Sequence, residues 1–151
     1  FEDVRVIARK DRVEMGSGNH YSWFGSVDGK KHSYVILVAG EDSVAGNIVF
    51  DNKMFQVRYA GKGVHTVQEI DMALFPDGEC SSASVFTAQT KPCLTTFESG
   101  SMIDVLVVYT AAAAAAALGD AGMIDQILLG IHETNMSYAN SGINQRDSLK
   151  I

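Results

Sequence analysis

The residues best suited to metal chemistry are His132 and Glu133, which open the string His132-Glu133-Thr134-Asn135-Met136. This string begins like H-E-x-x-H, the helical motif in which two imidazoles hold zinc and the glutamate is the general base. The second imidazole position holds Met136, whose thioether is a poor zinc ligand, and no histidine follows it. We therefore expect no metal site here and interpret His132 as a histidine on a helix surface. Three further histidines stand alone, without a spacing that indicates a metal site: His20, His32 and His65.

The sequence also contains aromatic residues and short basic clusters, which are found in sugar-binding and nucleic-acid-binding sites. The rings of Tyr21, Trp23 and Phe24 are able to stack on a sugar or a base, but such rings in a small sheet usually belong to the core or cover its edge. The net charge of −6 and the shortness of the basic clusters, Arg9-Lys10 and Lys30-Lys31, argue against nucleic acid. We favour core rings and solvated turn lysines.

Length and composition are those of one or two small folded domains. The chain has 151 residues, of which 46% are hydrophobic and 20% charged, with two prolines. Its longest apolar stretch, 102–118, is alanine in its second half, so we expect no membrane span. The chain begins at Phe1 without an initiator methionine, and we interpret it as processed or trimmed.

The C-terminal third predicts a β-α-β unit. Residues Met102–Thr110 are a nearly unbroken β-branched and apolar run, which is typical of a strand covered on both faces. A helix over Met123–Asn140 follows from apolar residues spaced three and four apart. A second strand over Ile143–Ile151 follows from the two-residue period of Leu149 and Ile151. We expect the two strands to be parallel, with this unit truncated at its last strand.

A short alanine-rich helix is predicted between the first strand and the long helix. Thr110 is a suitable N-cap for Ala111–Leu118, and Gly119 is a suitable left-handed residue to end it. Asp120 is then expected to cap the long helix.

Two strings in this third carry a family resemblance. They are Ile103-Asp104-Val105-Leu106-Val107-Val108-Tyr109-Thr110, before the alanine run, and Glu133-Thr134-Asn135-Met136-Ser137-Tyr138-Ala139-Asn140-Ser141-Gly142-Ile143-Asn144, after it. Together they resemble the opening of the catalytic domain in secreted bacterial reprolysin-like zinc endopeptidases, of the metzincin clan. The upstream part is more loosely similar to the β-rich propeptide of such enzymes. The resemblance implies a secreted, extracellular protein.

The zinc string of that family, H-E-x-x-H-x-x-G-x-x-H, is absent from this chain. The resemblance implies zinc as the cofactor of the parent family, where metal-polarised water attacks the peptide carbonyl. For this chain we expect no catalytic residue, no metal ligand and no cofactor.

The N-terminal half predicts an antiparallel β-meander, sandwich- or barrel-like, so that the fold class is α+β. Turn signals recur every eight to twelve residues between short apolar or alternating runs. Ser33–Ala39 is apolar throughout and should be a central strand. Asp28-Gly29 is the strongest hairpin signal, a two-residue type I′ turn. The expected strands are Val4–Ala8, His20–Val27, Ser33–Ala39, Ser43–Phe50, Met54–Tyr59 and Val64–Ile70.

The domain boundaries follow from where these patterns stop. Residues 1–75 form the propeptide-like domain, 76–101 a Ser/Thr-rich linker with both cysteines, and 102–151 the truncated β-α-β segment. In a secreted chain, Cys80 and Cys93 most simply form one disulfide. The alternatives are free thiols and a cysteine switch, in which a propeptide thiolate blocks the catalytic zinc of a zymogen.

Two functional hypotheses remain. The first is the non-catalytic N-terminal portion of a zinc endopeptidase precursor, with the remainder of the catalytic domain as partner. The second is a homo-oligomeric structural subunit that assembles by strand exchange into an extracellular filament, because unpaired strand edges recruit strands from other copies. In the second, the N-terminal segment completes the edge beside Met102–Thr110. The candidate assembly residues are Val4, Val6, Ile7, Val105, Val107, Leu149 and Ile151.

We predict that Cys80 and Cys93 are bonded to each other. Thiol titration of the denatured, unreduced protein should find no reactive thiol, whereas the reduced protein should show both. Two titratable thiols without reduction would refute the disulfide.

Overall fold

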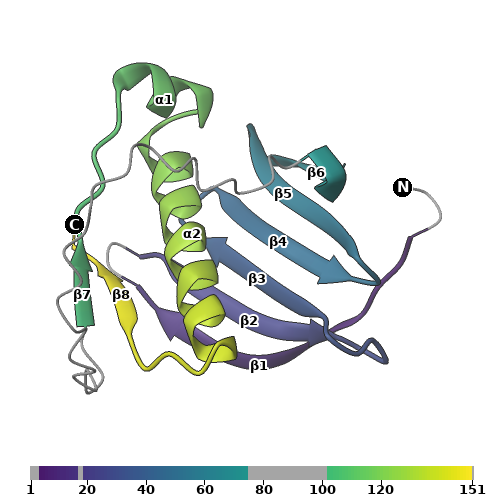
Figure 1. Cartoon of the computed structure of the whole chain (residues 1–151). Helices are drawn as coiled ribbons and strands as arrows, with labels where there is room; N and C mark the ends of the chain where they lie inside the picture. The colour runs from purple at the N-terminus through teal and green to yellow at the C-terminus, as the bar shows by residue number, and fades with distance from the viewer. Residues whose placement is uncertain (1–3, 17–18, 75–101, 151) are drawn as a thin grey trace, which may run out of the picture.

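The computed structural model describes residues 4–16, 19–74 and 102–150 (Figure 1). The first part holds six strands and a 3-10 turn: β1 (Ala8–Met15), β2 (Tyr21–Val27), β3 (Tyr34–Ala39), β4 (Val44–Phe50), β5 (Lys53–Gly61), β6 (Val64–Ile70) and η1 (Met72–Leu74). The second part holds β7 (Met102–Val105), α1 (Ala111–Ala116), α2 (Asp120–Asn140) and β8 (Arg146–Leu149). The predicted linker, with Cys80 and Cys93, lies outside the described residues.

The six strands form one antiparallel meander, in which each strand pairs with the next along the chain. This confirms the predicted α+β class and the meander. The sheet is open, since β1 and β6 are its edges among the described residues. Helix α2 lies across one face of this sheet, with β7 and β8 at its flank (Figure 1).

Strand β3 is central, as its apolar sequence predicts. It pairs with β2 and β4, and its side chains are buried on both faces: Val35 is 2% exposed and the adjacent Ile36 is 1% exposed. One core cluster packs Phe24, Ile36, Val38 and Ala45 against Leu128 and Leu129 of α2. The second cluster holds Val27, Val35, Phe50 and Phe55.

Five of the six predicted meander strands are confirmed within two residues, but the first is wrong. Residues 4–7 are not a strand, and β1 instead runs through the charged stretch that follows Ala8. An edge strand has one neighbour and a largely exposed surface, so β1 shows no apolar alternation to recognise. Ile7 stays close to the sheet through its carbonyl, which accepts a hydrogen bond from Asp28 N at 2.7 Å.

The predicted two-residue turn at Asp28-Gly29 is also wrong. Only Gly29 has a positive φ there, at 71°, and the connection continues to Ser33. The Ser33 hydroxyl accepts a hydrogen bond from Val27 N at 3.0 Å and donates one to Lys30 O at 2.8 Å, which closes a wider loop. Two-residue loops with positive φ at both positions, as in a type I′ turn, lie instead at Asp51-Asn52, with φ of 50° and 58°, and at Lys62-Gly63, with φ of 54° and 74°.

The C-terminal part is a parallel β-α-β unit, as predicted, but its strands are shorter. Met102 pairs with Arg146 and Val105 with Leu149, and the strand ends there rather than at Thr110. A β-prone sequence forms a ladder only where a partner strand runs beside it, and β8 spans four residues.

The helix boundaries are close to the prediction. Thr110 is the N-cap of α1, because its hydroxyl accepts a hydrogen bond from Ala113 N at 3.2 Å. The left-handed residue after α1 is Leu118, with φ 62°, rather than Gly119. Helix α2 starts three residues earlier than expected, with Gly119 as N-cap and Asp120 inside the helix, so the predicted Asp120 cap is wrong.

Candidate functional site

The face of α2 that packs on the meander carries ionisable side chains among its apolar ones. Asp125, His132 and Glu133 share this face with Leu128 and Leu129, at the three- and four-residue spacing of a helix. Each of the three bonds to a meander residue. We call these three residues and their partners the polar seam.

Asp125 is the innermost member of the polar seam. Its side chain is fully buried, and its two carboxylate oxygens have separate partners. Oδ1 lies 2.8 Å from His20 Nδ1, and Oδ2 accepts a hydrogen bond from the Ser43 hydroxyl. The backbone N–H of Gly40, which donates to Ser43 O at 2.9 Å, lies close to this carboxylate and lowers its pKa. Burial raises the pKa of Asp125, and the hydrogen bonds from Ser43 and His20 oppose that shift.

Gly40 is the residue that lets the sheet approach this carboxylate. A Cβ at position 40 would lie 3.0 Å from His20 Cε1 and 3.3 Å from Asp125 Oδ1. A side chain there would push His20 or α2 outward. The close contact of the backbone with Asp125 therefore depends on glycine.

The Asp125 cluster contains the residue types of a hydrolase triad but not its order. In a triad, the serine hydroxyl contacts the imidazole, which removes its proton. Here Ser43 and His20 both contact the carboxylate instead. Ser43 is 3% exposed, so it is also closed to substrate. The cluster attaches α2 to the meander and has no arrangement for acyl transfer.

His132 occupies the next position along the polar seam. Its Nε2 lies 2.6 Å from the hydroxyl of buried Ser22. Its ring meets the Phe24 ring edge to face, with centroids 5.0 Å apart, and the Arg12 guanidinium lies 3.7 Å from the centroid of that same ring. Burial lowers the pKa of His132; Glu14 opposes this shift and Arg12 adds to it. The expected helix-surface histidine is therefore wrong, because the ring faces the sheet.

Glu133 forms the third contact of the polar seam. Its Oε1 accepts a hydrogen bond from Asn47 Nδ2 at 2.6 Å. Burial, together with the nearby Glu133 carboxylate, raises the pKa of Tyr34. Burial lowers the pKa of the Arg58 guanidinium, and the nearby Glu133 charge opposes this. Arg58 of β5 is half-buried near this carboxylate.

One buried atom beside Glu133 has no hydrogen bond. Asn47 is 2% exposed, and its Oδ1 lacks a partner although its Nδ2 is bonded to Glu133. Leaving a buried amide oxygen unpaired costs about 1–3 kcal/mol. The unpaired oxygen thus offsets part of what the Asn47–Glu133 hydrogen bond contributes.

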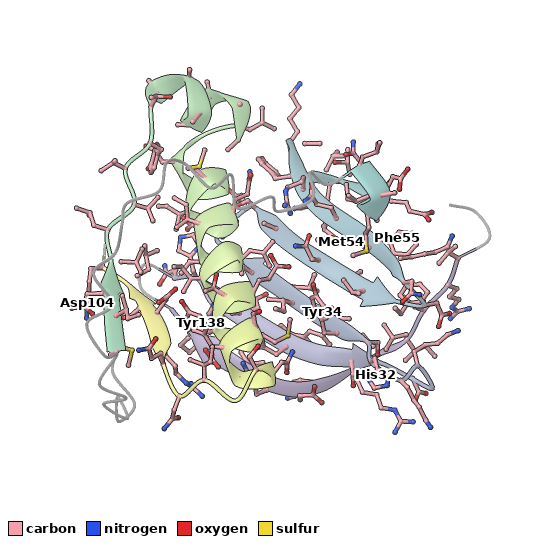
Figure 2. The ribbon with its side chains drawn as sticks, in the orientation of Figure 1. His32, Tyr34, Met54, Phe55, Asp104 and Tyr138 are labelled. Carbon is pink, nitrogen blue, oxygen red and sulfur yellow. The ribbon has the colours of Figure 1, made fainter. Side chains whose placement is uncertain are left out.

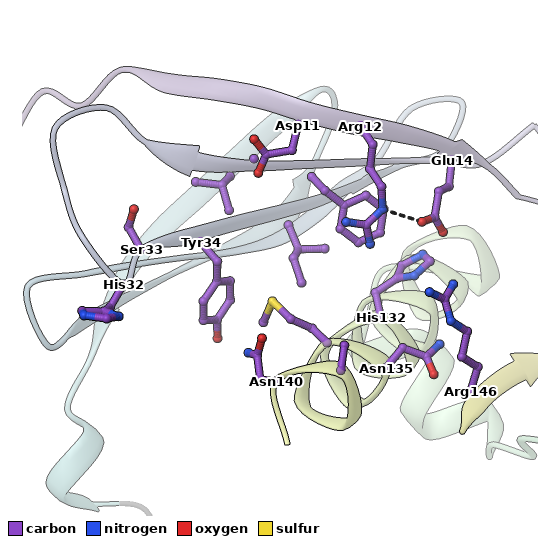
Figure 3. Close-up of a pocket in the computed structure, with 16 residues that line it drawn as sticks. Asp11, Arg12, Glu14, His32, Ser33, Tyr34, His132, Asn135, Asn140 and Arg146 are labelled. Carbon is purple, nitrogen blue, oxygen red and sulfur yellow. Dashed lines mark hydrogen bonds and ion pairs between the residues drawn. The ribbon is translucent and has the colours of Figure 1, made fainter. Parts of the chain in front are cut away.

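A cavity of about 970 Å³ opens where the C-terminal half of α2 rises from β1, β2 and β3 (Figure 3). Arg12 and Glu14 of β1, which pair at 2.7 Å, and His132 of α2 line one end. Tyr34 and Asn140 line the part nearer the end of α2 (Figure 3). The lining mixes acids, bases and apolar groups without concentrating one charge.

Asn135, which also lines this cavity, connects α2 to β8. Its amide nitrogen donates to Asp147 O at 2.9 Å, and its amide oxygen accepts from Asp147 N at 2.7 Å. The side chain thus replaces a neighbouring strand for one residue of β8. Asn135 belongs to the string that carries the family resemblance, but sequence reasoning assigned it no role.

The other predicted sites concern metal binding, the isolated histidines, the aromatic rings and membrane spans. Within residues 4–16, 19–74 and 102–150, no three His, Cys, Asp or Glu side chains converge as metal ligands. His65 accepts a hydrogen bond from Val44 N at 3.0 Å, and His32 is exposed at the cavity rim. Phe24 is buried and Trp23 packs on the second core cluster, as expected of core rings, but Tyr21 is 44% exposed. No helix in these ranges is long and apolar enough to cross a membrane.

The predicted assembly residues lie on several separate surfaces. Val4, Val6 and Ile7 are 44%, 36% and 64% exposed in the segment before β1. Val105 pairs with Leu149 inside the β7–β8 ladder. Val107 lies beyond the end of β7 and is 36% exposed. Ile151 lies outside the described residues.

In comparisons with known proteins, no family model, no curated protein and no solved structure matches the chain. The resemblance to zinc endopeptidases therefore stays a prediction.

The lowered pKa of His132 predicts that stability falls in mild acid. The unfolded chain binds the proton at the ordinary histidine pKa of 6.5 and the folded chain at a lower pH, so folding is progressively disfavoured as the pH falls below 6.5. Asp125 acts in the opposite direction, because its raised pKa makes the folded state the stronger proton binder.

Comparison with His132→Gln isolates the histidine, since Asp125 is present in both proteins. The stability of the wild type relative to this variant should decrease between about pH 7.5 and about pH 5, measured by urea unfolding. The exposed His32→Gln variant is the control and should follow the wild type. A His132→Gln difference that does not change with pH would contradict the assignment.

Proposed function

We propose that this chain is the non-catalytic N-terminal portion of a secreted zinc endopeptidase precursor. In this proposal the meander is a propeptide template that holds the first β-α-β unit of the catalytic domain in place. The observation that carries the proposal is the polar seam: α2 is held on the meander through Asp125, His132 and Glu133, each with its own meander partner.

The chemistry of the polar seam suits a template. Hydrogen-bonded ionisable groups fix one register, because a shifted helix would bury a charge without a partner. They add less net stability than apolar residues of similar volume would, since their desolvation offsets the attraction. The contact is mixed, because Leu128 and Leu129 of α2 also pack in the first core cluster. In this proposal the apolar residues hold α2 on the meander and the polar seam sets its register.

The exposed side chains of the β-α-β unit also support the proposal. Leu106 and Val108 are 79% and 83% exposed, and Met102 of β7 is 64% exposed. Among the described residues β7 pairs with β8 alone, and Asp104 lies on its outer side (Figure 2). Such apolar runs are typical of strands inside a parallel sheet. In the proposal, later strands of the same catalytic domain cover this surface.

The alternative function is a structural subunit that assembles by strand exchange. It is favoured by the exposed N-terminal residues Val4, Val6 and Ile7, which lie outside the sheet although their sequence suits a strand. In a filament, this segment of one copy would pair beside β7 of the next. The two proposals differ in what covers β7.

Intact mass and particle size of the native material separate the two. The precursor proposal expects a parent polypeptide much larger than the 16.3 kDa of this chain. A native mass of 16.3 kDa in large particles would overturn it and favour the filament. Elemental analysis of the purified chain adds a check, since we expect no zinc; stoichiometric zinc would contradict the assignment of a non-catalytic portion.

A further inference from the structure

The two edges of the meander differ in how they are protected against pairing. Five of the eight residues of β1 are charged, and its ladder with β2 is interrupted by a register shift between Lys10 and Arg12. Charged side chains and bulges are the usual means of blocking an edge strand. Strand β6, at the opposite edge, has a single carboxylate, Glu69, among its seven residues. The β5–β6 ladder also has a register shift, between Tyr59 and Gly61 of β5, so the β6 edge differs from the β1 edge in its smaller number of charged side chains.

The polar side chains of β6 lean over the sheet rather than across its edge. Glu69 pairs with Lys53 of β5 at 2.9 Å, and His65 reaches β4 to accept the hydrogen bond of Val44 N. Between them on the same face stands Val67, which is 48% exposed. Val64 is 59% exposed at the start of the strand. Val67 and Val64 thus leave exposed apolar surface on the two opposite faces of this edge strand.

The order of apolar and polar residues in β6 is the same from either end of the strand. From Val64 to Ile70 the order is apolar, polar, polar, apolar, polar, polar, apolar, with Val67 at the centre. Antiparallel pairing of two such strands about Val67 opposes Val67 with Val67 and Val64 with Ile70. It also opposes His65 with Glu69, so no like charges face each other. A one-residue slip removes these matches.

We propose that two copies of this chain pair through β6, antiparallel and two-fold symmetric about Val67, and join their meanders into one continuous sheet. A two-fold contact uses the same patch on both copies and closes on itself. The product is a discrete dimer, not a filament. The inference goes beyond the proposed function and does not depend on it, because neither α2 nor β7 takes part.

The test compares Val67→Lys with Val13→Lys, the same exchange on the protected β1 edge, where Val13 is 45% exposed. In sedimentation velocity the wild type and Val13→Lys should be dimeric. In Val67→Lys two lysines would face each other across the axis, which should raise the dimer dissociation constant by about tenfold or more. A monomeric wild type, or a Val67→Lys protein that remains dimeric, would overturn the proposal. Circular dichroism checks that each variant is folded.

A cysteine pair tests the register independently. In the proposed dimer Val67→Cys places two thiols directly opposite each other, at a separation suited to a disulfide. Mild oxidation should give a covalent dimer in non-reducing electrophoresis, whereas Val13→Cys and the wild type should stay single chains. Absence of the Val67→Cys dimer in a protein that sediments as a dimer would overturn this register.

Discussion

The arrangement of α2 on the meander depends on the buried carboxylate of Asp125. A carboxylate removed from water is tolerated only where hydrogen-bond donors surround it, and Ser43 and His20 supply them from the strand ends of the sheet. These donors are fixed by the meander, so they determine the position of α2. His132 then reaches Ser22 and Glu133 reaches Asn47 along the same helix face. The apolar contacts of Leu128 and Leu129 fill the space between these polar contacts.

Much of the fold could be predicted from the sequence, because the patterns that define it are local. The apolar run of β3 and the turn residues gave the order of the meander, and the run before Thr110 gave the parallel unit. The strand at 4–8 and the turn at Asp28 failed because an edge strand and a side-chain-closed loop leave weak local patterns. The polar seam was missed because its partners are distant in sequence: His20 and Asp125 are 105 positions apart. The one feature of the sequence that could have indicated it was Asp125, a charged residue among the regularly spaced apolar residues of α2.

The polar seam and the exposed β7 region together suit a protein part that folds with a partner. The polar seam fixes the position of α2 with hydrogen bonds, which favour one register over others. The β7 region leaves apolar side chains in solvent, as a strand does before its neighbours are in place. The β6 edge is a different surface from β7. Pairing of two copies through β6 is therefore compatible with completion of the β-α-β unit by further strands.

A double-mutant cycle on Asp125→Asn and Ser43→Ala tests most directly whether the Asp125 cluster holds α2 on the meander. Both singles and the double variant are compared with the wild type in free energy of unfolding by urea. Because the hydroxyl and the carboxylate are direct partners, the account predicts a coupling energy of about 1–3 kcal/mol. Single effects that add to within about 0.5 kcal/mol would contradict it.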